Sequence, residues 1–145
     1  MLPLPALTIF TLIGFPPADS DRIKGWCADK LEVNWGNPDP ERQRRSARNM
    51  RAYVEYCAAF VARRRHEIAR GEPADDLVGA LVTDERALTD VEITSLNFAS
   101  SFAGHETTTN LLGNMLRHLL ADSGPDGSGA WAVRASGRGS ARTAP

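Results

Sequence analysis

The stretch Ser101–Asn114, SFAGHETTTNLLGN, decides how this chain is interpreted. Its surroundings predict a helix, yet a glycine, an acid and three consecutive threonines lie at its middle. Gly in a helix interior costs about 1 kcal/mol relative to Ala, and Thr costs roughly half as much. A helix selected only for stability would not combine these residues, and local rules tend to be broken at functional sites. The stretch therefore predicts a helix that carries a site.

Helical signals dominate the sequence on both sides of this stretch. Thr89 and Glu92 have the T-x-x-E spacing of a capping box and open a helix that should run to about Leu120. Asp39 should cap another long helix, and Gly71 should end it. Further helices are expected over residues 5–13, 19–35, 41–70 and, after Pro73, 74–83. There is no strand-like alternation and no internal repeat, so the chain is expected to be all-α.

The composition of the chain argues against some kinds of binding partner. The 145 residues are 42% hydrophobic with a net charge of −1, which gives no support to nucleic acid or an acidic membrane as a partner. The apolar N-terminus is too short to span a membrane and lacks signal-peptide features, so a cytoplasmic location is expected. The helix over 41–70 pairs an apolar stripe with an arginine-rich face, which is either solvated or binds phosphate. The stripe is Met50, Tyr53, Val54, Cys57, Phe60 and Val61.

Small residues share one face of the last helix. Ala99, Ala103 and Thr107 are four apart, with Gly104 beside them. Such a stripe lets a flat, bulky ligand lie close to the backbone. Two other interpretations stay open: a second helix packs into the same groove, or the threonines from Thr107 onward bond back to carbonyls one turn earlier.

The acid of this stretch, Glu106, needs a partner or a function if it is buried. The letters HETTT begin like the zinc motif HExxH, but that site needs a second histidine at position 109, where Thr109 stands. His118 is too far along the helix to replace it. The zinc interpretation therefore fails, and no metal ligand is assigned in this chain.

The segment Phe102–Leu112 resembles the I helix of bacterial cytochromes P450, whose signature is (A/G)-G-x-(D/E)-T-(T/S). Ala103–Thr108 match all six positions. Residues 3–26 look like the family's segment leading into the F helix, the arginine-rich helix looks like the G helix, and residues 73–82 look like the H helix. The resemblance implies that residues 1–120 are part of a P450 domain, from about the E and F helices to a long I helix.

The resemblance also implies a chemistry. The I helix would cross the distal face of a haem in a monooxygenase that inserts one oxygen atom of O₂ into a small organic substrate. Electrons would come from a ferredoxin- and reductase-type partner. Glu106 and Thr107 would be the acid–alcohol pair that delivers protons. The cofactor-binding residues would be Ala103, Gly104, Thr107 and Thr108, and the substrate-binding residues Ala99, Phe102 and Ala103.

Other motifs of the family do not occur in this sequence. Neither Cys27 nor Cys57 lies in an F-x-x-G-x-x-x-C-x-G loop, which supplies the axial thiolate, and the E-x-x-R motif is missing. The chain is therefore expected to be inactive alone. Residues 121–145 have a composition typical of disorder and are expected to be an out-of-frame tail from a frameshift, a truncated pseudogene product or a gene-model error. A non-catalytic helical module that binds a protein partner remains the alternative.

Overall fold

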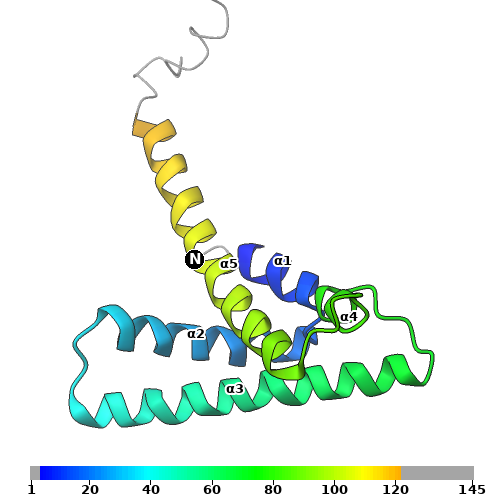
Figure 1. Cartoon of the computed structure of the whole chain (residues 1–145). Coiled ribbons are helices and arrows are strands. Elements are labelled where there is room, and N and C mark those ends of the chain that lie inside the picture. The colour runs from blue at the N-terminus through cyan, green and yellow to red at the C-terminus, as the bar shows by residue number, and fades with distance from the viewer. Residues whose placement is uncertain (1–3, 122–145) are drawn as a thin grey trace, which may run out of the picture. The chain divides into compact units, whose positions relative to one another are not determined.

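The structure, a computed structural model, describes residues 4–121 and is shown in Figure 1. These residues form five α-helices and one 3-10 turn, without a strand, which confirms the all-α class for this part of the chain. The elements are α1 (Leu4–Ile13), η1 (Pro17–Asp19), α2 (Ser20–Trp35), α3 (Pro40–Ala69), α4 (Leu77–Val82) and α5 (Asp90–Ala121). None of these helices is long and apolar enough to cross a membrane. The tail expected to be disordered lies, apart from Ala121, outside the described residues.

The chain divides into two compact units within α5. The first ends at Thr107 and the second begins at Thr108. The first unit contains α1 to α4 and the buried core. In it, α2 and α3 lie side by side and antiparallel, joined by a short loop (Figure 1). The second unit is described by itself, as the remaining turns of α5.

The two long helices begin where local chemistry predicts. The side chain of Asp39 accepts hydrogen bonds of 2.9 Å from the backbone N–H groups of Glu41 and Arg42. At the start of α5, a Glu92 carboxylate oxygen accepts a 2.8 Å bond from the Thr89 N–H, and the Thr89 hydroxyl accepts a 3.3 Å bond from the Glu92 N–H. Both expected caps are therefore confirmed.

The short helix before α5 begins later than expected. It starts at Leu77, not directly after Pro73, because Asp76 is its cap: the Asp76 carboxylate accepts a 2.8 Å bond from the N–H of Gly79. The carbonyl of Ala74 lies where a Gly79 side chain would be, 2.4 Å from an ideal Cβ. The backbone before Asp76 thus folds back against α4 and cannot be its first turn.

The core lies between α1, α2, α3, α4 and the start of α5. Its buried hydrophobic residues are Ala6, Phe10, Ile13, Phe15, Ile23, Cys27, Tyr53, Cys57, Phe60, Val61, Val78 and Ile93. The apolar stripe expected on α3 is confirmed except at Val54, which is 44% exposed. Val54 directly follows buried Tyr53, and the helical rotation of one residue turns it out of the interface.

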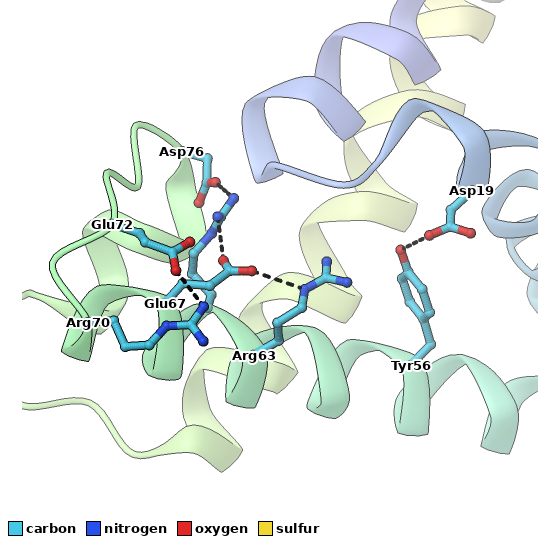
Figure 2. Close-up of polar contacts among 8 residues, drawn as sticks. Asp19, Tyr56, Arg63, Glu67, Arg70, Glu72 and Asp76 are labelled. Atoms are coloured by element: carbon cyan, nitrogen blue, oxygen red, sulfur yellow. Dashed lines mark hydrogen bonds and ion pairs between the residues drawn. The ribbon is translucent and has the colours of Figure 1, made fainter.

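A partly buried arginine, Arg64, joins α3 to the loop before α4. Arg64 bonds to Asp76 and, at 2.8 Å, to Glu67. Figure 2 labels these two carboxylates at the C-terminal part of α3. Gly14, at φ +96°, leaves space there: a Cβ on it would lie 2.3 Å from the Asp76 carboxylate. The arginine-rich face is thus not uniformly solvated. At this end of α3 its side chains are paired with carboxylates of the chain itself.

Glycine 104 is also a packing residue. An ideal Cβ there would lie 2.8 Å from Cγ1 of Ile9, so the absence of a side chain lets α1 approach α5 closely. The interpretation of a second helix in the small-residue groove is therefore confirmed at Gly104. Helix propensity alone would make Gly104→Ala neutral or stabilising, but the contact with Ile9 opposes that gain.

We expect Asp76→Ala to lower the free energy of unfolding by about 1–3 kcal/mol, because it removes a helix cap and leaves the partly buried Arg64 with one fewer carboxylate. Urea denaturation followed by circular dichroism measures the change. Glu55→Ala, which breaks the exposed pair with Arg51, is the control and should have little effect. Equal effects of the two variants would contradict a structural role for Asp76.

We expect Gly25→Ala and Gly104→Ala to differ in sign or size. Gly25 lies within α2 with nothing near its missing Cβ, so alanine should stabilise the chain by up to about 1 kcal/mol. At Gly104 the same gain is opposed by the displacement of Ile9. Thermal unfolding of both variants makes the comparison, and an equal stabilisation would show that α1 does not pack closely here.

Candidate functional site

The expected ligand face of α5 is exposed in this structure. Ala99, Ala103 and Thr107 all lie on the solvent-accessible side of the helix. The hydroxyl of Thr107 donates a 2.7 Å hydrogen bond to the carbonyl of Ala103, one turn earlier. The back-bonding expected as one interpretation of the threonines is thus confirmed at Thr107. A hydroxyl that donates its hydrogen to the backbone still has acceptor capacity, so Thr107 can accept a second hydrogen bond on this side.

One aromatic residue flanks this exposed face. Phe102 is half-buried, and its ring stacks on Trp35 at the end of α2 with 6.2 Å between ring centroids and 12° between planes. The ammonium group of Lys30 lies 4.3 Å from the centroid of the same ring. Phe102 is therefore held by α2 next to Ala99 and Ala103, where the expected substrate side lies. Thr108, the first residue of the second unit, is also exposed.

The candidate acid lies away from the candidate alcohol. The Glu106 side chain is 15% exposed, and its Oε1 lies 2.8 Å from Nε2 of His105. Since Thr107 bonds to the backbone instead, the two expected proton-relay side chains do not contact one another directly in the described residues.

His105 is a site residue that the sequence interpretation missed. Its side chain is buried, its Nδ1 lies 3.2 Å from the carbonyl oxygen of Ser101, and its ring centroid lies 5.8 Å from that of Phe10 on α1. A signal was present: His105 falls four residues after Ser101 and eight after Asn97, on one helix face. All three are buried. The buried face of α5 is thus largely polar.

Hydrogen bonds connect this buried face of α5 to side chains of α3 and α2. The Tyr53 hydroxyl bonds to the Ser101 hydroxyl and accepts a 3.8 Å hydrogen bond from the Cys27 thiol. Burial raises the pKa of Tyr53 well above its ordinary value. Burial raises the pKa of the Cys27 thiol to about 11, and that of Cys57 to about 12. The Glu106 carboxylate adds to the rise at Cys27.

These environments decide what the residues could hold. A flat cofactor fits against the exposed side of α5, because no side chain larger than threonine projects from the row Ala99, Ala103 and Thr107. An iron ion does not fit the cysteines, because metal binding needs a thiolate and both thiols are buried and protonated at neutral pH. Within residues 4–121 there is also no group of three or more His, Cys, Asp or Glu side chains placed to hold a metal.

Similar proteins were found by sequence. No family model matches the chain. The chain is 36% identical over 121 residues to the erythromycin C-12 hydroxylase of Saccharopolyspora erythraea. The matched region covers 81% of this chain and 29% of the hydroxylase. It is 34% identical over 123 residues to the cyclomarin C epoxidase CymV of Salinispora arenicola, and this match covers 81% of this chain and 29% of the epoxidase.

Solved structures share the fold of the same part of the chain. Cytochrome P450 CREJ, in complex with (4-ethylphenyl) dihydrogen phosphate, superposes with a TM-score of 0.70 at 38% identity, covering 81% of this chain and 28% of CREJ. P450BioI, in complex with an acyl carrier protein carrying hexadec-9Z-enoic acid, gives a TM-score of 0.70 at 25% identity.

The relatives identify the family and its cofactor. The chain spans about three-tenths of the length of these relatives. Haem is the cofactor that they imply. The sequence match and the structure match each cover 81% of this chain, and the chain belongs to the cytochrome P450 family.

Proposed function

We propose that this segment forms the distal wall of the haem pocket in a haem-thiolate monooxygenase that inserts one oxygen atom of O₂ into a small organic substrate. The observation that carries the proposal is the exposed row Ala99, Ala103 and Thr107, backed by a buried face that anchors the helix. A hydroxylase and an epoxidase among the relatives support this reaction class.

Each residue has a role in this proposal. The haem, when bound, supplies the activation of dioxygen. Ala103, with only a methyl group, leaves space over the haem plane, while Ala99 and Phe102 line the substrate side. Gly104 contributes by letting α1 approach α5, which keeps the helix in place.

Glu106 and Thr107 would act on protons. The Thr107 hydroxyl accepts a hydrogen bond on the exposed side and passes its own hydrogen on when its bond to the Ala103 carbonyl is exchanged. Glu106, mostly buried, holds the proton that restores the hydroxyl, and a water molecule would connect the two side chains. A ferredoxin- and reductase-type electron source is supported by the family resemblance alone.

A second candidate function is a non-catalytic module that binds a protein partner. The second unit supports it, because the α5 residues Leu111, Met115, Leu116, Leu119 and Leu120 are exposed. Exposed apolar groups of this kind mark interaction surfaces. Size-exclusion chromatography of the chain is a direct check: a monomer at high micromolar concentration would count against association through these residues.

We expect the 145-residue chain with hemin to show no thiolate-type absorption after reduction and CO binding. A chimera in which this segment replaces the matching part of the erythromycin C-12 hydroxylase should show that absorption, because the rest of the hydroxylase supplies the thiolate. A thiolate-type band from the chain alone would mean that Cys27 or Cys57 ligates iron. A chimera that folds but binds no haem would contradict the proposed distal wall.

We expect Thr107→Ala in this chimera to keep the haem spectrum but to uncouple oxygen consumption from product. Product per oxygen consumed should fall by about tenfold or more, since a positioned proton donor contributes ~10²–10⁴-fold. Hydrogen peroxide and product are measured together. Ser95→Ala is the matched control, because Ser95 donates the same kind of bond, 2.8 Å to the Val91 carbonyl, away from the site. Normal coupling in Thr107→Ala would refute the role of the hydroxyl.

A further inference from the structure

His105 lies between the two residues to which the resemblance gives roles, yet the proposed function leaves it without one. The polar contacts of its ring include that of Nδ1, 3.2 Å from the Ser101 carbonyl oxygen, and that of Nε2, 2.8 Å from Glu106 Oε1. Phe10 of α1 packs against the ring. The ring is buried, and each of its nitrogens lies against an oxygen atom of the protein.

The acceptors around the ring fix the number of protons. A carbonyl oxygen only accepts, so the contact with Ser101 requires a hydrogen on Nδ1. The contact with Glu106 then needs exactly one further hydrogen, because a bare Nε2 and an ionised carboxylate would repel. That hydrogen lies either on Nε2, giving imidazolium and carboxylate, or on Glu106, giving neutral imidazole and carboxylic acid.

The groups around this pair do not compete with it for the proton. Among the titratable groups of the packed helices, Cys27 of α2 interacts electrostatically with Glu106 and with Lys30, and Tyr53 of α3 bonds to the Ser101 hydroxyl. Cys27 and Tyr53 stay neutral at neutral pH because burial raises the pKa of each. Neither neutral group competes with His105 for a proton.

We propose that His105 is the positioning residue of Glu106, and that the two side chains share one proton across the 2.8 Å contact. His105 holds the carboxyl group in the buried junction and keeps a proton available next to Thr107. The part of this inference that concerns delivery to Thr107 rests on the proposed function. In that step the shared proton leaves the pair, which becomes carboxylate and neutral imidazole, and water returns the proton through the exposed part of Glu106.

Nitrogen NMR of the full chain without haem tests the pair. The sequence has three histidines, His66, His105 and His118, so ¹⁵N-histidine labelling gives three assignable rings. We expect His105 to carry a hydrogen on Nδ1, and Glu106→Gln to move the Nε2 signal to that of an unprotonated nitrogen. Glu55→Gln, a surface control, should move none of the rings. A bare Nδ1 in the parent chain, or a parent chain in which Nε2 is bare while Glu106 is ionised, would overturn the proposal.

A second variant covers the case in which Glu106→Gln fails to fold. His105→Phe keeps a ring against Phe10 but removes both nitrogens. With ¹³C-glutamate labelling, the Glu106 carboxyl signal should shift in this variant, while those of the other glutamates stay in place. An unmoved Glu106 signal in the folded variant would overturn the pair.

The delivery role is tested in the chimera with the hydroxylase. His105→Phe and Glu106→Gln should each lower coupled turnover, and the double variant should be no worse than the poorer single one, because residues acting as one unit are not additive. Additive losses would overturn the positioning role. A chimera without haem would count against the proposed function and not against the pair, since the NMR experiments need no haem.

Discussion

The contact between Tyr53 and α5 is the one on which the other arrangements depend. Tyr53 is fully buried, its ring stacks on Trp26 of α2 at 5.2 Å, and its hydroxyl bonds to Ser101 of α5. Phe98 of α5 packs on the same ring at 5.0 Å. One side chain of α3 thus fixes both α2 and α5. A tyrosine hydroxyl inside a core needs a hydrogen-bond partner, and Ser101 is that partner for Tyr53.

Once Ser101 faces Tyr53, helix geometry assigns the residues of the following turn. His105, four residues later, must point to the same buried side, while Ala103 and Thr107 point outward. The polar buried face and the small exposed face are therefore two consequences of a single helix rotation. Because Gly104 lies between these faces, it is the residue on which α1 can approach.

This arrangement separates two tasks in one helix turn. The outward side presents methyl groups and one hydroxyl, which suits close approach of a flat group, and the inward side holds an acid that is bonded to histidine. Burial limits the access of water to the acid, whereas the small residues are open to solvent. A helix accommodates both because adjacent residues point in different directions. Loss of the His105 contact would therefore affect the acid without altering the outward face.

The sequence alone determined the helical class, the caps at Asp39 and Thr89, and the family motif of Ala103–Thr108, because these depend on residues within one or two turns. Only the tertiary structure decided the pairing of Arg64 with Asp76, the exposure of Val54, the contact of Gly104 with Ile9 and that of His105 with Phe10. Helix periodicity predicts that residues share a face but not which neighbour covers it. That choice is made by the packing of helices that are distant in sequence.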